Sequence, residues 1–340
     1  MRKQIIIWVV ALAGFLVDCQ AQDSTFWMGA DISGTTSLEA RGIQLYNASG
    51  EPRENTVLMK ELGMNAIRLR IWVDPPGGFC SKEDMLVLAK RAKALGMPVM
   101  IDFHYSDSWA DPEKQPIPRA WQGMDLRQMC KALARHTRET LQLMKKNGID
   151  VRWVQIGNET TGGMLWEMGR AWPDMTNYAL LNNSGYDAVK KVYPHAQCIV
   201  HVDCGAVLSR FRDFFNALKE KGGKWDIIGM SVYPYWDLKG NHVHSEEETL
   251  HNVPRNVYYL AEEFGTDVMV VETGYECSRP EEGKAFLTQL IHALRHDTEG
   301  HCRGVFYWAP EAEGPYPLGA FKDHRPTVIM DAFSAASDEQ

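Results

Sequence analysis

From residue 26 to residue 330 the chain repeats one pattern: a short, nearly continuous apolar run is followed by a longer stretch with helical periodicity. Continuous apolar runs are typical of strands buried on both faces, and strands that alternate with helices build parallel sheets. The pattern predicts eight strands: Phe26–Ile32, Ala66–Val73, Pro98–Phe103, Val151–Gly157, Gln197–Val202, Trp225–Val232, Asp267–Val271 and Gly304–Ala309.

The intervening stretches predict amphipathic helices, and several of them end at a glycine, as helices commonly do. The clearest are Asn55–Leu62, Lys82–Leu95, Leu126–Lys146, Thr176–Val192, Phe211–Glu220, Glu246–Phe264 and Glu281–Arg295.

Eight such units favour a closed barrel over an open doubly wound sheet, because no linker rich in Pro, Gly and Ser divides them. Length alone would allow 340 residues to form two or three domains. No strand is followed by a G-x-G-x-x-G or Walker loop, which disfavours nucleotide binding. We predict an α/β protein with a single (β/α)8 TIM barrel as its catalytic domain over residues 22–340.

Residues 1–21 have the features of a signal peptide: Arg2 and Lys3, then an apolar stretch, then Cys19-Gln-Ala21. Cleavage after Ala21 would release the protein, whereas cleavage before Cys19 would leave a lipid anchor. Asp18 is a poor match to the small residue of lipoprotein signals, which favours release. We expect an exported protein, secreted, periplasmic or on the cell surface, with no transmembrane segment.

The composition excludes several classes of protein. It is 45% hydrophobic and 24% charged, which is ordinary for a globular protein. The net charge is −8 and no basic stripe is visible, so nucleic acid is not an expected partner. Six cysteines follow Cys19 without metal-ligand spacing, and we expect buried thiols rather than disulfides. We expect a monomer.

Polar residues gather directly after the predicted strands, where barrel enzymes carry their chemistry. Glu159 and Glu272 stand out because each follows an uncharged strand, and these strands lie across the mouth from each other. Glycoside hydrolysis requires such a pair of carboxylates. Arg68, Asn158 and Tyr233 are placed to orient and polarise the pair.

A metal site is the competing use of the same mouth. His104, His201, Asp203 and Glu272 could form one, but barrel metallohydrolases usually carry an H-x-H pair on the first strand, which here ends in Gly-Ala-Asp31. The H-x-H pair His242-Val-His244 falls in a loop and is interpreted as a solvated helix start. We predict no metal and no cofactor.

Tryptophans are numerous, 11 in all, and their positions separate them. Those in or beside mouth loops are expected to form a cleft where sugar rings stack, whereas those within strands are expected in the core. The mouth group is Trp109, Trp121, Trp236 and Trp308, and the strand group is Trp27, Trp72 and Trp153.

Six motifs, in order from Trp27 to Pro310, resemble the arabinogalactan endo-β-1,4-galactanases, glycoside hydrolase family 53. The most specific is His104-Tyr-Ser-Asp-Ser-Trp-Ala-Asp-Pro112. The others are Gly29-Ala-Asp-Ile-Ser33, Arg68-Leu-Arg-Ile-Trp72-Val, Ile156-Gly-Asn-Glu159, Ser231-Val-Tyr-Pro-Tyr235 and Val270-Val-Glu-Thr273.

The resemblance implies retaining, endo-acting cleavage of β-1,4-linked galactose in pectic galactan and type I arabinogalactan by double displacement. It implies Glu159 as acid/base, with a raised pKa, and Glu272 as an ionised nucleophile beside Arg68. Asn158 would hold a sugar hydroxyl, and Arg68 and Tyr233 would contact the nucleophile. The expected substrate-binding residues are Asp31, Arg68, His104, Asp107, Trp109, Asn158, His201, Asp203, Tyr233, Trp236 and Trp308.

The chain departs from the family pattern after strand seven, where the segment from Glu272 to Glu281 is short. No Asp- and Asn-rich cage follows Trp308, so we predict no structural calcium. Two other functions stay open. One is a barrel glycosidase for another β-1,4-glycan such as mannan or xylan, in which His201, Asp203 and Trp236 would differ. The other is a noncatalytic glycan-binding barrel.

Overall fold

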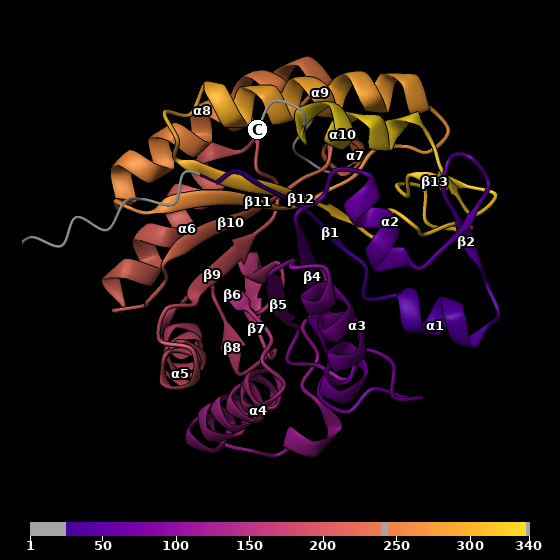
Figure 1. Ribbon diagram of the computed structural model, residues 1–340. Helices are drawn as coiled ribbons and strands as arrows, with labels where there is room; N and C mark the ends of the chain where they lie inside the picture. Colours follow the sequence, from indigo (N-terminus) through magenta and orange to yellow (C-terminus); the bar gives the residue numbers. More distant parts are fainter. Residues whose placement is uncertain (1–24, 240–243, 338–340) are drawn as a thin grey trace, which may run out of the picture.

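Eight parallel strands close into a barrel in the computed structural model, which describes residues 25–239 and 244–337 (Figure 1). Around the barrel the hydrogen-bonded order is β1-β12-β11-β10-β9-β6-β5-β4. The predicted TIM barrel is therefore confirmed, and all eight predicted strands are present. They are β1 (Trp27–Asp31), β4 (Ala66–Ile71), β5 (Val99–Phe103), β6 (Val151–Ile156), β9 (Gln197–Val202), β10 (Ile227–Val232), β11 (Asp267–Thr273) and β12 (Cys302–Trp308).

Helices cover the outside of the barrel (Figure 1). The predicted helices are all present, and four of the glycines that end them have the positive φ that favours this residue. The covering helices are α2 (Asn55–Glu61), α3 (Lys82–Ala94), α4 (Leu126–Lys146), α5 (Thr176–Val192), α6 (Leu208–Glu220), α8 (Glu246–Phe264) and α9 (Pro280–His296), and the glycines are Gly63, Gly96, Gly148 and Gly265.

Short elements in the connections that follow the barrel strands were not predicted. Their strands have only two residues each, too few to show a period. They are the hairpins β2 (Leu45–Tyr46)–β3 (Pro52–Arg53), β7 (Gly163–Met164)–β8 (Gly169–Arg170) and β13 (Phe321–Lys322)–β14 (Arg325–Pro326), with the helices α1 (Thr35–Ala40), α7 (Pro234–Lys239) and α10 (Asp331–Ser337).

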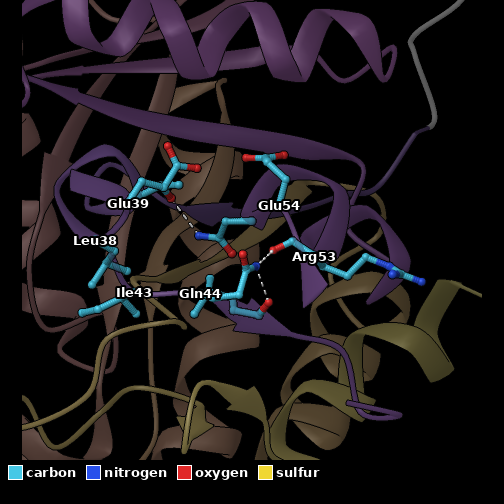
Figure 2. A pocket seen from close by; sticks show the side chains of 9 residues that line it. Leu38, Glu39, Ile43, Gln44, Arg53 and Glu54 are labelled. Carbon is cyan, nitrogen blue, oxygen red and sulfur yellow. Dashed lines mark hydrogen bonds between the residues drawn. The ribbon is translucent and has the colours of Figure 1, made fainter. Parts of the chain in front are cut away.

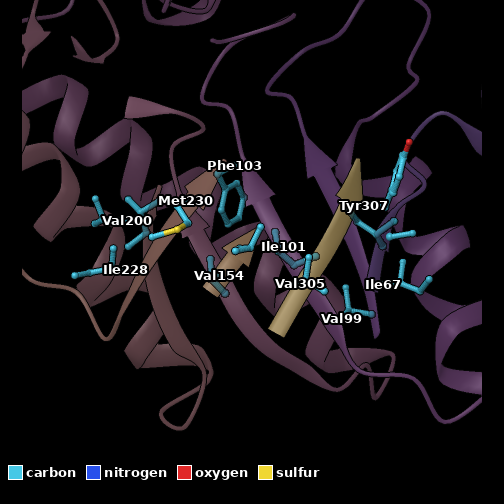
Figure 3. Packing of buried hydrophobic residues seen from close by; sticks show 14 of the residues in the cluster. Ile67, Val99, Ile101, Phe103, Val154, Val200, Ile228, Met230, Val305 and Tyr307 are labelled. Carbon is cyan, nitrogen blue, oxygen red and sulfur yellow. The ribbon is translucent and has the colours of Figure 1, made fainter. Parts of the chain in front are cut away.

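The larger hydrophobic core lies between the barrel and its helices. Figure 3 shows outward-facing residues of the strands in this layer, among them Ile67, Ile101 and Val154. These residues alternate along their strands with others that face the barrel interior, since successive side chains point to opposite faces.

The interior of the barrel is layered. An apolar cluster draws at least one residue from every strand: Trp27, Ala66, Met100, Trp153, Ile199, Ile227, Met269, Val271 and Phe306. Two residues further along four of these strands stand the polar residues Arg68, Asp102, Gln155 and His201. The period of a strand points these side chains to the same interior, one layer nearer the carboxyl ends. The barrel therefore carries a polar layer on an apolar plug.

Gly29 shows how tightly the plug is filled. A Cβ atom at Gly29 would lie 2.2 Å from Cε1 of Phe306, so the ring of Phe306 occupies the space that any larger residue would need.

The thiols and the membrane prediction can be compared with the structure directly. The six described cysteines are all free, as expected, but only Cys80, Cys198 and Cys302 are buried.

No helix of residues 25–239 and 244–337 combines the length and the apolar character that crossing a membrane requires. The predicted signal peptide, residues 1–21 with Cys19, lies outside the described residues.

Candidate active site

Arg68 lies in the polar layer with no exposed surface. Its Nη1 is 2.8 Å from Oδ2 of Asp31, and its Nη2 is 3.0 Å from Oδ2 of Asp102 and 2.7 Å from Oε1 of Glu272. Nε donates to Oε1 of Gln155 at 2.6 Å. A guanidinium presents its donors in a rigid, planar fork. It therefore fixes the relative positions of these partners, which come from four different strands.

The three carboxylates compensate the cost of burying this cation. A buried charge is strongly disfavoured unless it is paired. Burial alone would raise the pKa of Asp102, but Arg68 and the adjacent ring of His104 hold it at about 2. His104 Nε2 lies 3.0 Å from Oδ2 of Asp102. Asp102 is therefore ionised and contributes negative charge at the centre of the site.

Glu272 points into the mouth because of an irregularity in the sheet. Met230 pairs with Val270, but the next residue, Ser231, pairs with Glu272, so β11 has one extra residue at this point. Such a bulge re-aims the side chain that follows it. Val271 and Glu272 can then both face inward. Glu272 is buried, and Oε2 accepts a hydrogen bond from the hydroxyl of Tyr233 at 3.1 Å.

Glu159 reaches the same place from the end of β6, which β10 and β9 separate from β11. It follows β6 with a φ of 44°, in the left-handed region that non-glycine residues seldom adopt and that is common at functional sites. Its Oε1 accepts a hydrogen bond from Oγ of Ser231 at 2.6 Å. Ser231 and Tyr233 are two residues apart on the β10 segment, so the two glutamates meet neighbouring groups of one strand.

Burial and mutual repulsion separate the protonation of the two glutamates. Burial raises the pKa of Glu159 well above its ordinary range, and the nearby Glu272 raises it further. Burial also raises the pKa of Glu272, but Arg68 opposes this shift. As the pH falls, Glu159 therefore takes up its proton at a higher pH than Glu272, whose charge Arg68 stabilises.

Aromatic rings line the mouth beside these carboxyl groups. Trp109 is 40% exposed, and the guanidinium carbon of Arg70 lies 4.0 Å from its ring centroid. The ring centroids of Trp109 and Trp308 are 5.6 Å apart, and that of Tyr316 is 4.8 Å from Trp308. Trp236 is 45% exposed. Partly exposed rings of this kind can stack on the apolar faces of sugars.

Comparison with known proteins gives the family. The model of glycosyl hydrolase family 53 matches residues 27–316. The chain belongs to glycosyl hydrolase family 53. A probable arabinogalactan endo-β-1,4-galactanase A of Aspergillus fumigatus is 34% identical over 316 residues, which are 85% of each protein. An endo-β-1,4-galactanase of Bacillus subtilis is 30% identical over 325 residues, 87% of this chain and 72% of the relative.

A solved structure of a fungal β-1,4-galactanase shares the fold of this family 53 chain. It superposes with a TM-score of 0.81 at 26% identity and covers 91% of this chain and 98% of its own. The predicted family and the predicted fold are both confirmed.

Two of the predicted substrate contacts, Asp31 and His201, are almost completely buried. Asp31 is 1% exposed and is held by Arg68 and by the hydroxyl of Ser33 at 2.6 Å. His201 has no exposed surface and contacts Gln155 and Ser231. Both side chains belong to the same buried polar cluster as Arg68, and their role as substrate contacts stays a prediction.

Asp107 and Asp203, two other predicted substrate contacts, bond to neighbouring segments of the chain. Asp107 accepts from the backbone N–H groups of Asp74 and Arg119 at 3.0 and 2.8 Å. Asp203 pairs with Arg210 at 2.7 Å and accepts from the hydroxyl of Thr161.

The structure shows how Asn158 is held and places two tryptophans differently from the sequence prediction. The side chain of Asn158 accepts from Arg68 and donates to the Ala110 carbonyl, which fixes its orientation. Trp121, expected at the mouth, is buried against Tyr105 and His136 and cannot stack on a sugar. Trp72, expected in the core, is only half-buried, and its ring centroid lies 5.3 Å from that of Trp109.

Four residues that the structure brings into the site were not among the predicted site residues: Asp102, Gln155, Ser231 and Tyr316. Three of them are polar residues inside apolar strands. Gln155, for example, lies two residues after the inward-facing Trp153. A polar residue in phase with the inward face is a signal that could have found them.

Two hollows are lined by neither Glu159 nor Glu272. One of about 160 Å³ lies between α1 and the β2–β3 hairpin, beside Glu39, Arg53 and Glu54, and contains no predicted site residue (Figure 2). A larger one of about 440 Å³ is lined by Tyr316 and His324 and adjoins the aromatic mouth. Within the described parts of the chain, no three His, Cys, Asp or Glu residues are arranged to hold a metal ion.

Replacing Tyr233 with phenylalanine tests the geometry around Glu272. The hydroxyl of Tyr233 lowers the pKa of Glu272, so Tyr233→Phe should raise it. The acid limb of the kcat/KM profile, where Glu272 becomes protonated, should move to higher pH by about half a unit to one unit. Tyr193→Phe, which removes a hydroxyl bonded to the Ile149 carbonyl, is the control and should leave the limb in place. If the acid limb did not move in Tyr233→Phe, the limb could not be assigned to the protonation of Glu272.

Proposed function

We propose that this family 53 glycoside hydrolase cleaves internal β-1,4-galactosidic bonds of pectic galactan and type I arabinogalactan by double displacement. The observation that carries the proposal is the meeting of Glu159 and Glu272 at Ser231 and Tyr233, with Arg68 on one glutamate only. The substrate follows from the relatives, which are named as galactanases.

In the first step Glu272 attacks the anomeric carbon of the galactose unit. The bond from that carbon to the glycosidic oxygen breaks, and Glu159 gives its proton to this oxygen as the leaving chain departs. A galactosyl ester on Glu272 results. The charge on Glu272, held by Arg68, makes it the nucleophile, and its pairing with Tyr233 orients one of its oxygens.

In the second step Glu159 acts as a base. The charge of Glu272 raises the pKa of Glu159, so esterification of Glu272 removes that contribution and lowers the pKa. Glu159 can then take a proton from water while the oxygen of that water attacks the anomeric carbon. The ester bond breaks, the configuration is retained and Glu159 is protonated again for the next cycle.

We propose that Trp109, Trp236 and Trp308 supply stacking surfaces for the galactan chain, supported by their exposure and their place at the mouth. Mannan and xylan differ from galactan in the orientation of ring hydroxyls, which polar residues at the mouth would read. The proposal disfavours these glycans and a noncatalytic barrel, because the chain has both glutamates and its relatives are galactanases.

We also propose export by the leader of residues 1–21, with release after Ala21, and a monomeric catalytic domain. The mass of the exported protein distinguishes release from a lipid anchor at Cys19. Light scattering measures the oligomeric state.

Incubation with linear β-1,4-galactan tests the substrate. New reducing ends should appear early, together with a rapid fall in viscosity, since an endo-acting enzyme cuts inside the chain. Mannan and xylan should give neither. The absence of new reducing ends from galactan would overturn the proposal.

Glu272→Ala should reduce hydrolysis of galactan and of aryl galactosides to background, because no nucleophile remains. Azide can occupy the space left by the carboxylate and attack from the same face. Azide should therefore restore activity toward aryl galactosides with an inverted galactosyl azide as the product. Glu276→Ala, in the connection that follows β11, removes a carboxylate paired with Arg279 and is the matched control that should retain activity. A retained product would exclude Glu272 as the nucleophile.

Glu159→Ala should reduce the rate on galactan by about 10²- to 10⁴-fold, the usual contribution of general acid catalysis. Substrates with good leaving groups need no acid, so their first step should be spared, and a burst of aryl alcohol should appear. Glu167→Ala, an exposed carboxylate in the same connection, is the control. Equal losses on good and poor leaving groups would show that Glu159 is not the acid.

A further inference from the structure

A chain of hydrogen bonds leads through the buried layer from Arg68 to Glu159. Arg68 Nε donates to Gln155 Oε1 at 2.6 Å, and Gln155 Nε2 lies 2.9 Å from Nδ1 of His201. His201 Nε2 lies 2.8 Å from Oγ of Ser231, which is 2.6 Å from Oε1 of Glu159. Gln155, His201 and Ser231 are each at most 2% exposed.

The direction of every bond follows from its first member. A guanidinium has donors only, so the atom of Gln155 that faces Arg68 must be the amide oxygen. The amide nitrogen of Gln155 then faces His201 and donates to Nδ1. The orientation of this amide is thus set by a charge and does not depend on a choice of flip.

Nδ1 of His201 is therefore an acceptor, and it also accepts from the backbone N–H of Glu159 at 3.3 Å. Asn158 Oδ1 lies 3.2 Å from the same nitrogen, and because Nδ1 already accepts from Gln155 and carries no hydrogen, two acceptors are in contact here. Burial and the charge of Arg68 lower the pKa of His201 well below its ordinary value. The ring is neutral and has its single proton on Nε2.

The hydroxyl of Ser231 can donate its hydrogen bond in one direction only. Its oxygen accepts from Nε2–H of His201, so its own hydrogen points at Oε1 of Glu159. A proton on Oε1 would have to be donated to Oγ, which would leave the hydroxyl hydrogen of Ser231 without this acceptor. The acid proton of Glu159 therefore resides on the other oxygen, Oε2.

We propose that Gln155, His201 and Ser231 are positioning residues that keep Oε1 of Glu159 an acceptor and confine its transferable proton to Oε2. The inference rests on the proposed role of Glu159 as acid/base. It goes beyond that role because it states which oxygen gives the proton and why. Arg68 would then orient both glutamates, Glu272 by contact and Glu159 through three intermediates.

Charged groups on several elements surround the two titrating members of this chain. Glu159 faces Glu272 from β11, Asp203 from the loop after β9 and Asp111 from the loop after β5, all of which raise its pKa, whereas the hydrogen bond from Ser231 lowers it. His201 is surrounded by Arg68, Asp102 and His104.

Ser231→Ala gives the decisive pH profile. Removal of a hydrogen bond to the charged form should move the basic limb of kcat/KM on galactan, where Glu159 loses its proton, to higher pH by about one unit. Ser231→Thr keeps the hydroxyl and should return the limb to its wild-type position. Thr273→Val removes another buried hydroxyl, one that donates to the Val232 carbonyl, and should leave the limb in place. A loss that is equal at every pH would assign Ser231 a merely structural role and overturn the proposal.

The wild-type enzyme provides a second test that no folding defect can obscure. Nitrogen-15 NMR of the histidine rings distinguishes the two neutral tautomers and the charged ring. His201, assigned by its absence in His201→Asn, should remain in the Nε2–H form from about pH 5 to pH 8. Protonation of Nδ1 would reverse the chain and overturn the proposal. If the wild type failed to cleave galactan, the proposed function would fail while the tautomer result stood.

Discussion

The buried guanidinium of Arg68 is the interaction on which the active end of this barrel depends. It is paired with carboxylates from β1, β5 and β11 and bonded to two residues of the β6 segment. The side chain of Arg68 itself has no exposed surface. An unpaired cation at this depth would be strongly destabilising, so these strands have to keep their mutual register. Loss of that register would separate the charges and the two glutamates together. The stability of the site and its chemistry are therefore coupled through one side chain.

The layering of the interior explains how a polar cluster can be held rigidly there. Large apolar residues such as Trp153 and Phe306 fill the barrel below it and exclude water. The polar side chains stand two residues further along the same strands, each restrained by neighbours on both sides. Catalytic groups that are prearranged in this way need little reorganisation during the reaction, which is the main source of electrostatic stabilisation in enzymes.

Much of this arrangement could be predicted from the sequence, since it depends on local periods. The eight continuous apolar runs, the helices with a period of 3.6 residues that end at glycine, and the position of Glu159 directly after a strand are all visible in neighbouring residues. The rest depends on contacts between strands far apart in the chain. Asp31 and His201 have the residue types of sugar contacts, and only the packing shows that they also bond to Arg68 and Ser231 inside the barrel. Gln155 and Ser231 look unremarkable in the sequence, yet both are members of one hydrogen-bonded chain.

The sequence by itself determined the barrel, the family motifs and the two glutamates, because each is encoded in neighbouring residues or in a fixed order along the chain. The tertiary structure alone decided where these glutamates point. Strict alternation after Val271 would turn Glu272 away from the mouth, and the extra residue opposite Ser231 turns it inward. Likewise the proton on Glu159 is directed by an arginine 91 positions earlier in the chain. The physical reason is the same in both cases: orientation depends on partners on other strands, and only closure of the barrel brings those partners together.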